Sequence, residues 1–181
     1  MDIKLNGGVL IIGSLLWDTE DAQRIKWRND FLKLEKQISQ LESKIPFFEK
    51  TNSSISSATV GWQIEHSLKT ILIIFNNVKN SNPENYKWKF NKIRLLIYVL
   101  NKFPRGKANA PKIVLPEGNI SEESLKKSLL NVKNELRNWD SLPKNAHFPH
   151  PYFGKLNKKS TEWFLNLHTK HHLKIINDIC K

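Results

Sequence analysis

The chain has 181 residues, of which 39% are apolar and 25% are charged. This composition fits one globular domain of ordinary size and excludes a disordered or fibrous chain. The 29 basic and 17 acidic residues give a formal net charge of +12. The lysines are spread over every predicted helix, without a recognition-helix or aromatic RNA-binding motif, so we expect no specific nucleic-acid partner.

Residues 1–28 do not share the pattern of the rest of the chain. An apolar run at residues 9–16 follows two glycines and favours a buried strand over a helix. It is too short to cross a bilayer, which takes about 20 residues. It leads into an acidic stretch rather than a cleavage site, which argues against a secretory signal. We treat residues 1–28 as an N-terminal extension: an added extension, a fused fragment, or a segment laid along the domain.

Residues 29–181 are predicted to form one helical domain. Apolar side chains recur at spacings of three and four, the period of an amphipathic helix. The predicted long helices cover residues 29–50, 60–80, 121–140 and 158–179, and a further apolar and basic stretch, residues 86–103, is predicted to extend or flank the second helix. Ser57 or Thr59 is the expected N-cap of the second helix, and Ser121 that of the third.

The connector at residues 142–156 carries three prolines, and no strand-turn-strand alternation is visible after residue 29. Four long amphipathic helices predict an all-α fold, a four-helix bundle with a long crossover connection. The single cysteine, Cys180, cannot form an internal disulfide. Together with the lack of a membrane span, this predicts a cytoplasmic protein with no membrane partner. A homodimer is left open.

Three of the six histidines lie in the last predicted helix: His168, His171 and His172. At about 100° per residue, all three fall on the arc that the apolar residues of this helix occupy. They are therefore expected to point into the domain, where an imidazole without a partner costs about 1–3 kcal/mol. His168 and His172 are spaced i and i+4, close enough to bind one metal ion.

A pair of histidines alone also fits a buried hydrogen-bonding network, so a third ligand decides between the two interpretations. The available histidines are His66, His147 and His150. His66 lies opposite the main apolar stripe of its helix, although that helix is apolar nearly all round. His150 is better explained as part of a connector anchored by Tyr152 and Phe153.

Three separated motifs together resemble the DinB-like superfamily of four-helix bundles. They are residues 60–68, the sequence HPYFGKL at 150–156, and HTKHHL at 168–173. They are most similar to an uncharacterised branch with HPxFGxL before a last helix that carries HxxHH. The resemblance covers residues 29–181 and implies a DinB-like helical bundle domain there. It leaves residues 1–28 unexplained.

DinB-like proteins typically bind a divalent metal through one histidine in the second helix and two, spaced i and i+4, in the last. The resemblance therefore implies His66, His168 and His172 as ligands, with His171 as a neighbour that does not contact the metal. It also implies a metal-dependent enzyme, either a hydrolase or an S-transferase that uses a low-molecular-weight thiol such as mycothiol or bacillithiol. Three nitrogen ligands suit Zn, Ni or Fe and leave coordination positions open.

Two further points stay open at this stage. Glu65, beside His66, is either a base or supporting residue of the site or, as the pattern favours, a solvated helix carboxylate. The alternative to an enzyme is a non-enzymatic helical-bundle binding protein with a buried histidine network. Substrate, reaction and catalytic residues are not predicted.

Overall fold

The structure is a computed structural model that describes residues 31–105 and 110–181. The expectations for residues 1–28 lie outside the described residues. The described chain is mostly helical, and the main helices are α2 (Val60–Lys79), α3 (Lys92–Leu100), α4 (Glu122–Leu136) and α5 (Lys158–Ile179). A first helix, described over residues 31–42, precedes them. The prediction of a mainly helical class is confirmed.

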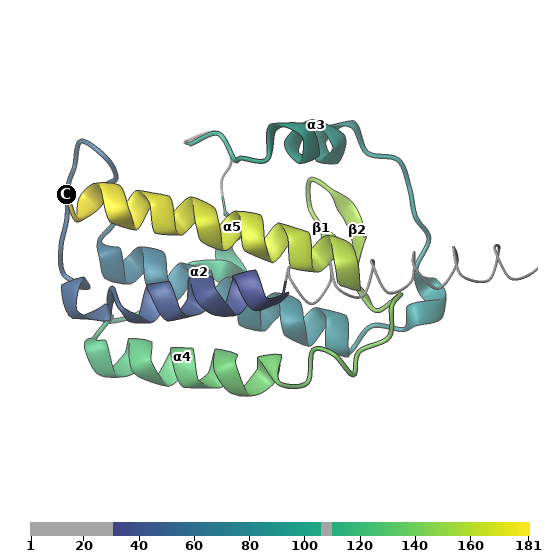
Figure 1. Cartoon of the computed structure of the whole chain (residues 1–181), viewed down its shortest axis with the longest axis horizontal. Coiled ribbons are helices and arrows are strands. Elements are labelled where there is room, and N and C mark those ends of the chain that lie inside the picture. Colours follow the sequence, from purple (N-terminus) through teal and green to yellow (C-terminus); the bar gives the residue numbers. More distant parts are fainter. Residues whose placement is uncertain (1–30, 106–109) are drawn as a thin grey trace, which may run out of the picture.

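The first helix, α2, α4 and α5 lie side by side around one apolar core (Figure 1). α2 packs against both α4 and α5. It has buried residues on nearly every side, as its all-round apolar sequence predicts. This central position buries His66 as well as the main apolar stripe of α2.

Two predicted helix starts are confirmed in detail. The Thr59 hydroxyl accepts a hydrogen bond from the backbone N–H of Trp62 and caps α2. Ser121 caps α4 in a reciprocal arrangement with Ser124, in which each side chain accepts from the other's backbone N–H. Two predicted ends were too late: the first helix stops at residue 42, before a short 3-10 helix at Ile45–Phe47, and α4 stops at Leu136.

The connector before α5 contains a hairpin, so the prediction of no strand pair after residue 29 was wrong. Strand β1 (His147–His150) pairs antiparallel with β2 (Gly154–Asn157), with His147 opposite Asn157. Gly154 has a φ of +71°, which the tight turn between the strands requires. Phe148 and Leu156 anchor the hairpin in the core. Each strand has only four residues, and β1 contains Pro149. Neither strand is therefore long enough to show an alternation of apolar and polar residues.

The apolar and basic stretch at residues 86–103 also differs from its prediction. Only Lys92–Leu100 is helical, and the Asn91 side chain caps this helix by accepting from the Arg94 N–H at 2.8 Å. α3 does not continue α2; it lies on the outer side of α5, at the edge of the molecule (Figure 1). Among residues 31–105 and 110–181, no helix combines the length and apolar character that a bilayer crossing requires.

Neighbouring leucines on α4 give a direct test of how this helix packs. Leu129 is 4% exposed in the core, whereas Leu130 is 58% exposed. We expect Leu129→Ala to lower the free energy of unfolding by about 2–5 kcal/mol, because it leaves a cavity. Leu130→Ala should change it by less than about 0.5 kcal/mol. Urea denaturation of both variants measures the difference, and equal losses would contradict this packing.

Candidate metal centre

Three histidines from two helices meet where α2 crosses α5. His66 comes from α2, and His168 and His172 come from successive turns of α5. One nitrogen of each ring lies within 4.8 Å of the others. His66 and His172 are buried and His168 is partly buried. The structure therefore brings together the three histidines named from the sequence, in an arrangement that could hold a metal ion.

His66 is oriented by the chain segment that crosses from α3 to α4. Its Nδ1 lies 2.9 Å from the backbone carbonyl oxygen of Val114, in a short 3-10 helix at Lys112–Val114. A carbonyl oxygen can only accept, so Nδ1 carries the proton and donates it. The Nε2 atom of His66 is then left with its lone pair, which is the form that binds a metal.

His172 is oriented in the same way by a side chain of α2. Its Nδ1 lies 2.6 Å from Oε1 of Gln63, which sits three residues before His66 on the same side of the helix. The Gln63 amide nitrogen donates to the Ser56 hydroxyl at 3.3 Å, which directs Oε1 toward His172. Nδ1 of His172 therefore donates, and its Nε2 presents a lone pair toward His168.

The spacing of His168 and His172 matches that of two ligands on one ion. Their Nε2 atoms are 3.2 Å apart. Two nitrogens at about 2.0–2.1 Å from one tetrahedral ion lie about 3.4 Å apart. The widest separation in the cluster, 4.8 Å, is larger than this, so the three rings have to draw closer around an ion. Within the described residues, Nδ1 of His168 is buried without a hydrogen-bond partner.

The surroundings keep all three imidazoles neutral. Burial lowers the pKa of His66, although its hydrogen bond to Val114 opposes this. Burial and then the neighbouring histidines lower the pKa of His168 and His172 well below the ordinary value. Neutral imidazole is the form that ligates metals, so the site is prepared for a cation without first having to lose protons.

Aromatic side chains flank the histidine cluster. Trp62 stacks on the His66 ring, with centroids 5.0 Å apart and planes inclined by 10°. Phe164, one turn before His168 on α5, lies 5.6 Å from its ring. These groups supply apolar surface and no competing ligand atoms. They lower the local dielectric constant around the histidine nitrogens.

The remaining histidines have other surroundings. His171 packs edge-on to Phe103 at 5.9 Å and is not a member of the cluster. His150 stacks on Phe153 at 4.3 Å and accepts from two backbone N–H groups of the hairpin turn. Burial lowers its pKa to about 4. His147 lies 3.1 Å from a backbone carbonyl at residue 145 through its Nδ1. Both belong to the hairpin.

Glu65 is not the solvated carboxylate that the pattern favoured. It is partly buried toward α4, and its Oε1 accepts from the Ser128 hydroxyl at 3.2 Å. Burial raises its pKa. It is not a member of the histidine cluster, because consecutive residues on a helix point about 100° apart.

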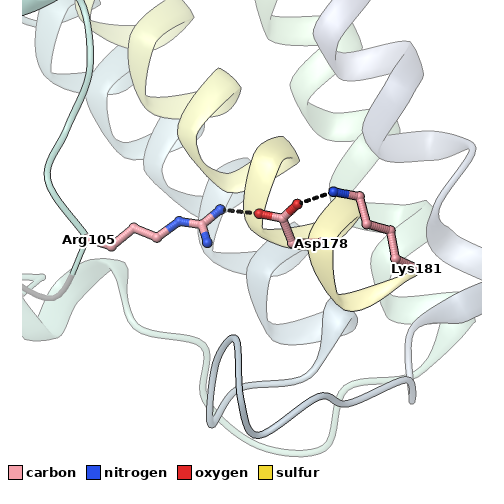
Figure 2. A network of polar contacts seen from close by, with 3 residues as sticks. All are labelled: Arg105, Asp178 and Lys181. Atoms are coloured by element: carbon pink, nitrogen blue, oxygen red, sulfur yellow. Dashed lines mark hydrogen bonds and ion pairs between the residues drawn. The ribbon is translucent and has the colours of Figure 1, made fainter.

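A surface ion pair ties the start of the crossover segment to the end of α5. Figure 2 shows Asp178 between two basic side chains, with Arg105 at 2.7 Å and Lys181 at 2.9 Å. Hydrogen bonds from Lys181 and Arg105 lower the pKa of Asp178 to about 2. Arg105 therefore holds the crossover segment nearly two turns beyond His171 and His172 on α5.

Two residues that orient the site were missed by the sequence analysis. The Val114 carbonyl is a backbone group of a loop, and no sequence pattern marks it. Gln63 could have been recognised from the sequence, because it is a polar residue one turn before His66 in a helix that is apolar nearly all round. It is 4% exposed, and a buried amide requires partners.

Comparison with known proteins gives no assignment. No protein-family model, curated protein or solved structure matches the chain. The resemblance to DinB-like proteins thus depends on the three motifs in the sequence.

The role of Gln63 can be tested through metal affinity. Gln63→Leu removes the acceptor that orients His172, and loss of such a partner typically weakens metal binding by about 10–100-fold. Gln63→Glu retains an acceptor oxygen and should bind close to wild type. Gln40→Leu, on an exposed position of the first helix, is the control. Titration with zinc in a competing chelator measures all three, and equal affinities would contradict the role of Gln63.

The lowered histidine pKa values predict a specific pH dependence for the metal-free protein. The unfolded chain takes up protons below about pH 6.5, whereas His168 and His172 stay neutral in the folded state until much lower pH. The unfolded state therefore binds more protons, and stability falls as pH drops below about 6.5. Urea denaturation in EDTA should show this loss, and His168→Gln should reduce it. Constant stability down to about pH 5 would contradict the burial of neutral imidazoles.

Proposed function

We propose that this chain is a metal-dependent enzyme in which His66, His168 and His172 hold one divalent ion. The observation that carries the proposal is the orientation of the rings. Nδ1 of His66 and of His172 donates to Val114 and Gln63, so that each Nε2 keeps its lone pair, and that of His172 faces Nε2 of His168. Several converging lone pairs stabilise a cation, whereas a hydrogen-bonding network needs a donor to face each of those lone pairs.

The donor set suits a catalytic ion rather than a structural one. Three imidazoles leave at least one position open, and Zn, Ni and Fe(II) all accept nitrogen ligands. An ion held in this way supplies Lewis-acid chemistry, because it lowers the pKa of a water or thiol in the open position. The chain itself contributes neutral ligands, fixed ring orientations and the aromatic surface of Trp62 and Phe164.

The proposed reaction class comes from the resemblance to DinB-like proteins. On that basis we assign a DinB-like four-helix bundle with a crossover between its second and third bundle helices. The activity proposed is an S-transferase that uses a low-molecular-weight thiol, or a hydrolase, acting in the cytoplasm. The side-by-side packing of the first helix, α2, α4 and α5 supports this assignment, as does the convergence of histidines from α2 and α5.

A second candidate function is a non-enzymatic binding protein with a buried histidine network. The 3.2 Å contact between Nε2 of His168 and Nε2 of His172 favours it, since one nitrogen can donate to the other. The two functions differ in their response to chelators. A hydrogen-bonded network keeps its stability in EDTA, whereas a metal site loses the contribution of the ion.

Metal content and thermal stability test the metal site directly. The protein purified without chelators should carry close to one divalent ion, and His168→Ala or His172→Ala should lose it. His147→Ala, in the hairpin, is the matched control and should retain it. Returning zinc to about one hundred times its dissociation constant should stabilise the metal-free protein by about 2.7 kcal/mol. A melting temperature at pH 7.5 that ignores both EDTA and added zinc or nickel would contradict the metal site.

The reaction class needs a separate assay on the metal-loaded protein. We expect it to accelerate either the consumption of bacillithiol by an alkylating electrophile or the hydrolysis of an activated ester. His66→Ala should abolish the rate, and His147→Ala should preserve it. If the metal-loaded protein is inactive in both assays, the proposed reactions are contradicted, whereas the proposed metal site is not.

A further inference from the structure

The outer face of α3 exposes large apolar side chains. Leu95, Leu96 and Val99 are 52%, 56% and 76% exposed. In the segment just before the helix, Trp88 and Phe90 are 66% and 60% exposed. We call these five residues the α3 apolar surface. Single exposed apolar residues are ordinary, but a group this large on one short segment marks an interaction site.

α3 packs on the domain through a charged residue, and most of its apolar side chains face outward. The buried residues of this helix are Arg94 and Ile97. The Arg94 guanidinium donates to the carbonyl oxygen of Phe153 at 3.3 Å and to that of Lys89, and Asn91 donates to the carbonyl oxygen of Tyr152 at 3.0 Å. The charged side chain thus faces the protein and the leucines face outward. These anchors hold the α3 apolar surface in place, so its exposure is a feature of the fold.

The chain around this surface is strongly basic. Between residues 85 and 116 there are eight lysines and arginines and no acidic residue. Lys87 and Lys89 alternate with the two exposed aromatic residues, and Lys92 and Lys102 flank the helix. All four lysines are exposed. A partner that complements this surface therefore has an apolar centre and negative charge at the edge of the contact.

We propose that the α3 apolar surface binds the face of an anionic lipid bilayer. Leucine, valine and aromatic side chains enter the boundary between headgroups and acyl chains, while neighbouring lysines contact anionic headgroups. The helix projects at the edge of the molecule (Figure 1), and a deformable bilayer accommodates such a ridge. A second copy of the chain would bring two basic surfaces together, and a nucleic acid would leave the aliphatic side chains without a role. This proposal does not depend on the metal site, and it replaces the expectation of no membrane partner.

Binding of the full-length chain to vesicles tests the proposal. We expect it to sediment with vesicles of equal parts phosphatidylserine and phosphatidylcholine, and poorly with phosphatidylcholine alone. The triple variant Leu95→Ser, Leu96→Ser, Val99→Ser keeps every charge and should bind at least about tenfold more weakly, because three inserted aliphatic groups are lost. Leu130→Ser, an equally exposed leucine on α4, is the matched control and should bind as wild type.

A dye that reports polarity separates insertion from general attraction by a basic protein. It is attached at Val99→Cys in a Cys180→Ser background, with Leu130→Cys as the control. Emission at residue 99 should shift to the blue only when anionic vesicles are added, and emission at residue 130 should not shift. Several results would overturn the proposal: undiminished binding of the triple variant, a blue-shifted dye at residue 99 without vesicles, or a wild-type dimer that the triple variant converts to monomer.

Discussion

Burying imidazoles between α2 and α5 is the constraint on which the arrangement of the site depends. A buried ring nitrogen needs a partner, and the helices themselves offer few, because their backbone groups are already bonded within each helix. The partners come instead from Gln63 on α2 and from the Val114 carbonyl in the crossover segment. The path of that segment is therefore linked to the chemistry of His66.

Lys69 strengthens this link between the crossover segment and α2. Its ammonium group donates to the Leu115 carbonyl at 2.7 Å, one residue after the group that orients His66. Two successive carbonyls of the segment are thus held by side chains spaced three residues apart on α2. A crossover connection is long and could take many paths, and these two contacts select one of them.

The sequence predicted the helical class and the pairing of His168 with His172 because both depend on local spacing. The i, i+4 pair His168 and His172 needs only the period of a helix, and the family resemblance supplied His66. Long-range partners carry no such pattern. Gln63 reaches His172 across 109 positions and Val114 reaches His66 across 48, so neither pair could be recognised from spacing along the chain.

The hairpin and α3 were mispredicted for a related physical reason. Periodicity identifies an apolar face but assumes that this face is directed toward the core. In α3 the hydrogen bonds of Arg94 to hairpin carbonyls decide the orientation, and the hairpin itself has strands too short to be recognised. Because β1 and β2 were not predicted, the hairpin carbonyls that position α3 could not be predicted either.

The anchors of α3 join its surface to the elements that surround the histidine cluster. α3 is attached to the hairpin through Arg94 and Asn91, upstream of the chain that leads to the site. Between α3 and Val114, the ion pair of Arg105 with Asp178 fastens the chain to α5. On the same connection, Phe103 packs against Phe164 and His171 of α5, and Phe164 lies 5.6 Å from the His168 ring. The fold accordingly exposes a binding surface on the same connection that positions a ligand, and that connection is fastened to α5 between the two.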